Sequence, residues 1–453
     1  MLRDLLSGSG GIDPSKLADA AGLPNDPASI AAIFGQLQQA MQRAEADGID
    51  WSLALRQAEQ RASGDQRQVE PAEAERLERA FDLAGLWLDE AVDLSALPGS
   101  PELLTRRSWA AATMPIWSQL AEPVATSIAD SLTRVMSEQA PEEMREMVQG
   151  ASRMMRGIGG AMFAMQLGQV VGQLSTEVVS GGDVGLPLLE DGRAALLPQN
   201  VAEFGEGLDI PNDQVELYLA VRELAHARLF RHARWLRLHL ITAITAFAQG
   251  IDVDLERLEQ LAEGFDPSNT DELRDAVANG ALLRPKSPEQ EAALGRLETM
   301  LALVEGWVDV VTADATSRLP KSDAVAETIR RRRATGGPAE SALATLVGLE
   351  LRPRRLRDAA AMWRAVTDAV GVGGRDALWA HPDLLPTSDD LDDPAPLAAR
   401  LAGGGSTGDA ADAEFDAALE ALLRGDLQSD DGGASDAEDD AGDDPSGEDP
   451  RTS

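Results

Sequence analysis

The sequence contains no cysteine, and only four of its 453 residues are histidine: His226, His232, His239 and His381. A chain without cysteine has no disulfides, no cysteine-ligated zinc and no thiol nucleophile. Any metal site must therefore be built from these imidazoles together with carboxylates.

Basic residues are outnumbered: 40 lysines and arginines face 77 aspartates and glutamates, which gives a formal net charge of −37. Such a surface repels nucleic acid and anionic membranes. The run of four arginines from Arg330 to Arg333 is an exception. We interpret it as the solvated end of a helix, or as a surface that receives the acidic C-terminal tail. We therefore predict that nucleic acid is not a partner.

Long apolar runs are also scarce. The N-terminus lacks the apolar core of roughly 7–15 residues that a signal peptide needs. Residues 157–176 carry no charge and are numerous enough to span a bilayer, but three glutamines interrupt them. Gly168 and Gly172 in this stretch favour close packing against another helix. We predict a packed internal helix, no stable membrane span and a cytoplasmic protein.

Helical periodicity dominates the rest of the chain, because apolar residues recur at spacings of three and four. The helices expected from this pattern and its Pro and Gly breakers lie within residues 28–46, 71–92, 102–179, 211–250, 288–315, 323–333, 338–349, 355–370 and 410–423. We predict a mainly α fold with a small β hairpin or sheet element. Its parts are an N-terminal helical region (1–98), a central domain (99–386) and an acidic, mostly disordered tail (387–453).

The β element is expected at residues 186–198. Two short apolar runs there flank Asp191-Gly192, which is a strong hairpin signal. The helical pattern that follows, residues 211–250, is long for one globular helix, so we expect a break between His232 and Trp235.

This long helix carries the sequence VRELAH, residues 221–226. A zinc peptidase helix has two histidines four residues apart, so that both face one ion, and a glutamate after the first histidine that activates water. Glu223 and His226 match the second half of this motif. Arg222 stands where the first histidine would be, and a guanidinium has no lone pair with which to bind zinc.

The motif alone leaves three interpretations open: a catalytic metal site, the remnant of one, or a buried helix with a salt bridge. His232 and His239 are poor replacements for the missing ligand, since on an unbroken helix they would point roughly 240° away from His226. Glu305 lies among apolar neighbours in LVEGWVDVV, where a lone carboxylate is costly. It is therefore either the partner of a buried arginine or a metal ligand.

Six stretches within residues 28–386 carry a resemblance to a known family: IDWSLALRQAEQ, ERAFDLAGLWLDEAV, QLGQVVGQLSTEVV, VRELAHARLF, LVEGWVDVV and LVGLELRPRRLRDAAAMW. They resemble the actinobacterial members of the zincin-like hydrolase family, the zinc-dependent metalloproteases related to the coenzyme F420 biosynthesis-associated group. The resemblance implies a zincin-like fold, a zinc cofactor and a peptide or protein substrate that pairs with the hairpin edge. It also implies roles for Glu223 as general base, His226 as zinc ligand and Glu305 as third ligand.

Arg222 departs from the intact motif, so two hypotheses follow. The first is a zinc-dependent metallopeptidase that uses Glu223, His226 and Glu305. The second is a catalytically inactive zincin-fold protein that binds peptides or acts as a scaffold. In that case the fork of Arg222 would pair with Glu305 or Glu223 in place of a metal. The sequence determines neither the partner nor the oligomeric state.

Overall fold

Helix α13 (Pro288–Ala315) illustrates how local signals set the limits of the helices. The Ser287 hydroxyl accepts a hydrogen bond from the Gln290 backbone N–H, and the Gln290 side chain accepts one from the Ser287 N–H. This capping box satisfies two N–H groups at the helix start, and Pro288 has no N–H to satisfy. The predicted span 288–315 is confirmed.

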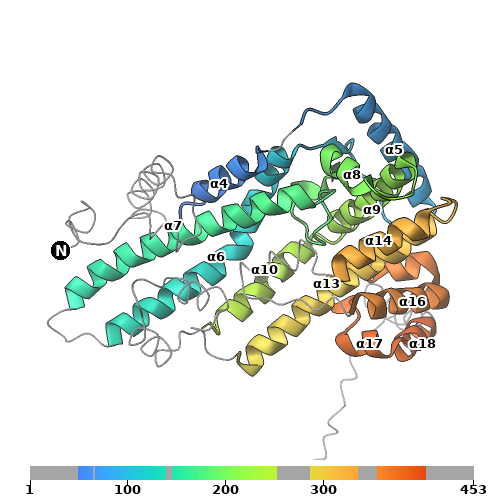
Figure 1. Ribbon diagram of the computed structural model, residues 1–453. Helices are drawn as coiled ribbons and strands as arrows, with labels where there is room; N and C mark the ends of the chain where they lie inside the picture. The colour runs from blue at the N-terminus through green and yellow to red at the C-terminus, as the bar shows by residue number, and fades with distance from the viewer. Residues whose placement is uncertain (1–48, 65–66, 139–144, 252–285, 335–354, 405–453) are drawn as a thin grey trace, which may run out of the picture. The chain divides into compact units, whose positions relative to one another are not determined.

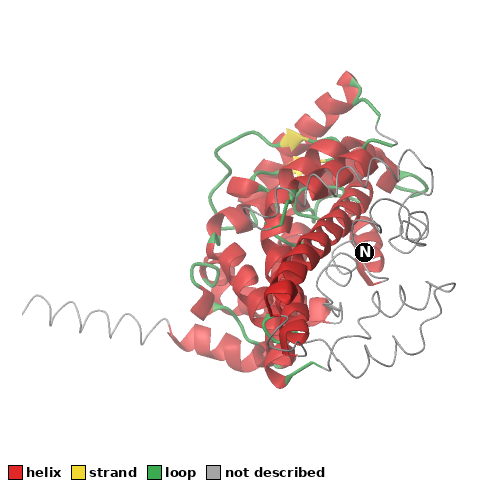
Figure 2. Cartoon of the chain, turned by 90° about the vertical axis from the view of Figure 1, so that its left-hand side faces the viewer, coloured by secondary structure: helices red, strands yellow, loops and turns green. Residues whose placement is uncertain are grey.

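Helices make up most of the described chain, as Figure 2 shows. The structure, a computed structural model, describes residues 49–64, 67–138, 145–251, 286–334 and 355–404. The other helices are α4 (Ser52–Ala62), α5 (Pro71–Asp89), α6 (Arg106–Glu138), α7 (Arg145–Glu177), α8 (Pro198–Gly205), α9 (Asn212–His232), α10 (Trp235–Ala248), α14 (Ser322–Ala334), α16 (Arg355–Ala377), α17 (Ser388–Asp392) and α18 (Pro394–Gly404). The strands are β1 (Glu102–Leu103) and β2 (Ala195–Leu196), and the 3-10 turns are η2 (Glu190–Gly192) and η3 (Pro382–Leu384). The predicted class, mainly α with a small β element, is confirmed.

Helices α4, α6 and α7 pack side by side (Figure 1). Gly168 and Gly172 of α7 face α4: a Cβ at Gly168 would lie 2.7 Å from the Gln57 Cβ, and one at Gly172 would lie 2.7 Å from the Arg61 Cβ. The two glycines therefore let the backbones of α7 and α4 approach closely, as the sequence predicted. No helix in the described parts of the chain is long and apolar enough to cross a membrane. The cytoplasmic location stays a prediction.

The close contact between α4 and α7 should make substitution of Gly168 destabilising. Gly168→Ala should lower the free energy of unfolding by about 1–3 kcal/mol, because the new methyl group overpacks the α4–α7 interface. Gly159 lies on the same helix with open space around its Cα. Gly159→Ala should therefore be neutral or stabilise the protein by up to about 1 kcal/mol through helix propensity. Urea denaturation of the two variants checks this, and equal stabilities would contradict the close contact.

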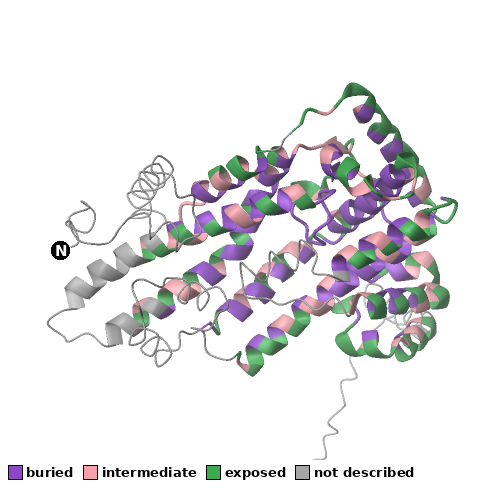
Figure 3. Ribbon diagram, in the orientation of Figure 1, coloured by how far each residue is buried: buried purple, intermediate pink, exposed green. Residues whose placement is uncertain are grey.

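Helix α9 lies at the centre of the packing, in contact with α5, α8, α13 and α14. Every residue from Val215 to Phe230 is buried, and Figure 3 shows this helix buried along most of its length. The helix ends at His232, and Ala233 leaves helical geometry with φ −92° and ψ 63° before α10 begins at Trp235. The break predicted between His232 and Trp235 is confirmed.

The β element differs from the predicted hairpin. β2 pairs in parallel with β1, which lies far earlier in the chain, and its other side bridges Ser180 in antiparallel orientation. Asp191, with φ 58°, and Gly192, with φ 63°, do form a tight turn. The apolar residues before this turn form no strand; they are buried as loop instead. The hairpin prediction is wrong because its pairing partner is not local.

The described helices continue past residue 387, where the acidic tail was expected to begin. A capping box at Thr387 starts α17, and Leu391 and Leu397 are buried in the core. Contacts divide the chain into two units, 1–401 and 402–453. The boundary predicted near residue 98 stays a prediction. The helices predicted at residues 28–46, 338–349 and 410–423 lie outside the described residues.

Candidate functional site

The buried stretch of α9, Val215 to Phe230, carries four residues with charged side chains, and each of them has a polar partner. Glu216 pairs with Arg76, and Arg228 pairs with Asp89 at 2.7 Å. A charge inside a protein is strongly unfavourable unless it is paired or hydrogen-bonded, so these contacts allow a charged helix to be buried on all sides. The remaining charged residues of the buried stretch, Arg222 and Glu223, belong to the predicted site.

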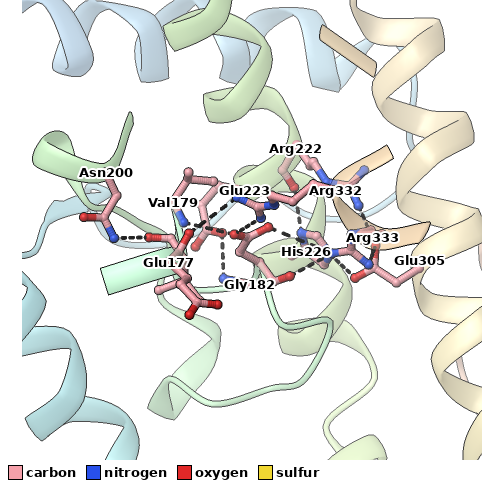
Figure 4. Close-up of polar contacts among 12 residues, drawn as sticks. Glu177, Val179, Gly182, Asn200, Arg222, Glu223, His226, Glu305, Arg332 and Arg333 are labelled. Atoms are coloured by element: carbon pink, nitrogen blue, oxygen red, sulfur yellow. Dashed lines mark hydrogen bonds and ion pairs between the residues drawn. The ribbon is translucent and has the colours of Figure 1, made fainter. Parts of the chain in front are cut away.

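Glu305 of α13 contacts three side chains of this site, and Figure 4 shows it beside His226 and Arg333. Its Oε2 lies 2.5 Å from Arg222 Nη2 and 2.7 Å from Arg333 Nη1, and its Oε1 lies 3.1 Å from His226 Nε2. Burial alone would raise the pKa of Glu305, but the charges of Arg333 and Arg222 outweigh burial and hold this pKa well below its usual range. Glu305 is therefore a carboxylate neutralised by two guanidinium groups.

His226 is completely buried and lies between two acceptors. Its Nδ1 is 3.1 Å from the Arg222 carbonyl oxygen, one helical turn back, and its Nε2 faces Glu305. Burial lowers the pKa of His226, although the Glu305 carboxylate opposes this shift. The lowered pKa favours the neutral ring, which has a single N–H, so in that form only one of these two contacts is a hydrogen bond.

Glu223 faces a different side of α9. Its Oε2 accepts a hydrogen bond of 2.8 Å from Gly182 N, its Oε1 accepts one of 2.8 Å from Ala195 N, and the Ser180 side chain also bonds the carboxylate. Burial raises the pKa of Glu223 to about 7, and these hydrogen bonds oppose the rise. In this arrangement Glu223 anchors the loop before β2, and both its oxygens are occupied.

The loop from Val178 to Leu189 covers the site and is buried throughout. A Cβ at Gly182 would lie 2.5 Å from the His226 Cβ. Gly185 has φ +76°, and a Cβ there would lie 2.5 Å from Glu305 Oε1. Glycine is required at both positions because the loop backbone lies directly against the site, and at Gly185 also because of its positive φ.

Helix α14 fastens this loop. Asp183 Oδ2 accepts from Val179 N at 3.0 Å and pairs with Arg332, while Arg333 Nη2 donates to the Asp183 carbonyl at 2.7 Å. Burial would raise the pKa of Asp183, but the charges of Arg332 and Arg333 lower it on balance. Arg333 thus bridges Glu305 to the loop. We call Arg222, His226, Glu305 and Arg333 the Glu305 network.

The structure brings together three of the four predicted site residues. His226 and Arg222 both contact Glu305, which is one of the two partners predicted for Arg222; the other was Glu223. Glu223 is adjacent but bonds the loop. His232 and His239 are exposed on the surface, in agreement with their rejection as ligands.

Sequence reasoning missed Arg333, which was interpreted as part of a solvated or tail-binding arginine run. A signal was present: Val325 and Ile329 are apolar and buried on α14, and Arg333 continues their spacing of four. Arg330 and Arg331 do match the solvated interpretation, since they are exposed and pair with acids of helices. The spacing therefore separates the buried arginine from its exposed neighbours.

The residues present do not fit a zinc ion. A tetrahedral zinc site takes at least three protein ligands, and Arg222 has the place of one of them. Within the described ranges, no group of three or more His, Cys, Asp and Glu side chains is arranged to hold a metal. Two guanidinium groups hold Glu305 Oε2, and their positive charges would also oppose a divalent ion at Oε1.

The edge predicted to receive a substrate strand is covered. β2 bonds β1 on one side, where Glu102 N donates to Ala194 O at 2.9 Å. On its other side Gly181 N donates to Ala195 O at 2.8 Å. A small recess reaches Glu223 from beside this loop, but neither His226 nor Glu305 lines it. A peptide cannot pair with β2 unless the loop first moves away.

The sequence pattern of a family described as zincin-like metallopeptidase matches residues 49–397. This span is most of the chain, so the chain belongs to that family. No curated protein matches it. A solved structure from Chloroflexus aurantiacus, a "putative hydrolase with a novel fold", is similar to this chain at 22% identity with a TM-score of 0.53. The match covers 78% of this chain and 98% of the other, and it shows a shared fold. The actinobacterial origin and the coenzyme F420 link stay predictions.

Proposed function

We propose that this chain is a non-hydrolytic member of the zincin-like metallopeptidase family, one that binds a peptide or protein partner or acts as a scaffold. The observation that carries the proposal is the Glu305 carboxylate, which Arg222 and Arg333 both neutralise inside the protein. This arrangement satisfies the charge of Glu305 without a metal.

The position of Glu223 supports the same proposal. A general base must lie within hydrogen-bond reach of the water that it activates. Both oxygens of Glu223 accept backbone N–H groups, one from Gly182 of the covering loop and one from Ala195 of β2, and the residue is 1% exposed. Binding of a peptide or protein is the part of a peptidase's role that needs neither the metal nor the base.

A second candidate is the zinc-dependent peptidase of the first hypothesis, with Glu223 as base and with His226 and Glu305 as zinc ligands. One observation favours it: His226 Nε2 and Glu305 Oε1 are 3.1 Å apart. Two ligands of one tetrahedral zinc ion, each about 2.0–2.1 Å from the metal, lie roughly 3.3 Å apart. The spacing of this pair is therefore close to that of two zinc ligands, although the third ligand is replaced.

The metal content of the purified protein distinguishes the two candidates. We expect full-length protein, purified without chelators and without a histidine tag, to carry far less than one zinc per chain. We also expect no chelator-sensitive cleavage of a denatured protein substrate. The control is His226→Ala, which identifies zinc bound elsewhere on the acidic surface. One zinc per chain that His226→Ala removes, together with cleavage, would establish the peptidase.

A further inference from the structure

We infer that Arg222 and Arg333 act as a pair that replaces a divalent cation on Glu305, so that a zinc site can be restored here only by changing both arginines. This inference rests on the proposed function. It assigns to Arg333 of α14 the same role as Arg222, which stands at the first-ligand position of α9.

The geometry of the Glu305 carboxylate points to the pair. Both guanidinium groups meet the same oxygen, Oε2, from different helices, at 2.5 Å for Arg222 and 2.7 Å for Arg333. Their combined formal charge equals that of one zinc ion. Oε1 is left for His226. The carboxylate thus has the charge environment of a metal ligand, but two ion pairs with guanidinium groups supply it.

Position 222 is well placed to supply the missing ligand. It precedes His226 by four residues, so the two side chains share one face of α9, and the side chain at 222 already reaches Glu305. Arg222→His would therefore complete a set of two imidazoles and one carboxylate, which is a known catalytic zinc ligand set.

Arg333 would oppose zinc in that single variant. Its guanidinium would still hold Glu305 Oε2, and its positive charge would still repel a divalent ion within a buried site. Because Arg333 also donates to the Asp183 carbonyl, the covering loop fixes its position. Arg332 provides a matched control: it is the adjacent residue, it pairs with the Asp183 carboxylate, and it donates to the Glu177 carbonyl of α7.

The experiment compares three full-length proteins: Arg222→His, Arg222→His with Arg333→Gln, and Arg222→His with Arg332→Gln. The probes are zinc chloride, in competition with a chromophoric chelator, and cobalt chloride, whose visible absorption reports tetrahedral coordination. We expect the Arg333 double variant to bind zinc at least about tenfold more tightly than the single variant. The Arg332 double variant should bind zinc no more tightly than the single variant does.

Three results would overturn the inference: tight binding by Arg222→His alone, no gain on removing Arg333, or an equal gain on removing Arg332. Zinc on the wild-type protein, lost in His226→Ala, would instead contradict the proposed function. The two failures are therefore distinguishable.

Removing Arg333 also removes a contact to the loop, so the double variant needs a stability test. If it folds only with zinc chloride present, as circular dichroism would show, the site has formed and the inference is supported. If the double variant does not fold at all, a variant without the three charged side chains tests the inference instead. Arg222, Glu305 and Arg333 all changed to methionine should be more stable than Arg333→Met alone, because no buried charge is left unpaired. A triple variant less stable than the single one would contradict the pairing.

Discussion

Replacing Glu305 with leucine is expected to lower the free energy of unfolding by about 3–5 kcal/mol. The change leaves the guanidinium groups of Arg222 and Arg333 buried without their carboxylate. Both side chains are less than a tenth exposed, so water cannot replace it. A loss of this size is a large part of the roughly 5–15 kcal/mol that stabilises a typical folded protein. Urea denaturation followed by circular dichroism measures it.

Asp309 provides the matched control for this prediction. It lies one turn after Glu305 on α13, but its partners Arg330 and Arg364 are 41% and 54% exposed. Asp309→Asn should lower the free energy of unfolding by less than about 1 kcal/mol, because exposed ion pairs contribute little. If Glu305→Leu were equally mild, the Glu305 network would not contribute to stability as its geometry indicates.

The helices could be predicted because their limits depend on local signals. Pro288 marks the start of α13. The helical pattern after Pro211 is too long for one globular helix, and its length indicated the break that the structure has at Ala233. The β element could not be predicted in the same way. β2 pairs with residues more than ninety positions earlier, and no local pattern reports such a partner. The turn at Asp191-Gly192 was real, but its conformation does not decide what its flanks pair with.

The candidate site was predictable where helix spacing decides. Arg222 and His226 are four residues apart and therefore lie on one face of the helix. Glu305 lies in an apolar stretch, where a buried carboxylate needs a charged partner. The contribution of α14 to the site was not predicted, because it depends on which of the four consecutive arginines are buried. Two of these side chains are exposed and two are mostly buried. Gly182 was not predicted as part of the site. Its close approach to His226 appears only once the loop is folded over α9.

The pH dependence of the free energy of unfolding should reveal the raised pKa of Glu223. Its usual pKa is 4.5, and in the folded protein burial raises its pKa to about 7. Between these values the folded protein keeps a proton that the unfolded chain has released. The free energy of unfolding should therefore fall as the pH rises from about 4.5 to about 7, by up to about 3 kcal/mol from this group. Above pH 7 the carboxyl is ionised in both states, and its contribution no longer changes.

Comparison of the wild type with Glu223→Gln isolates this effect. Glutamine cannot titrate, and its amide group can accept from only one of the two backbone N–H groups, so at pH 5 the variant should be about 1–3 kcal/mol less stable than the wild type. Because His226 and Glu305 are present in both proteins, their opposing pH effects cancel in the difference. That difference, from urea denaturation at pH 5, 6, 7 and 8, should shrink as the pH rises. A constant difference would mean that Gly182 and Ala195 keep Glu223 ionised throughout, with hydrogen bonding rather than burial deciding its charge.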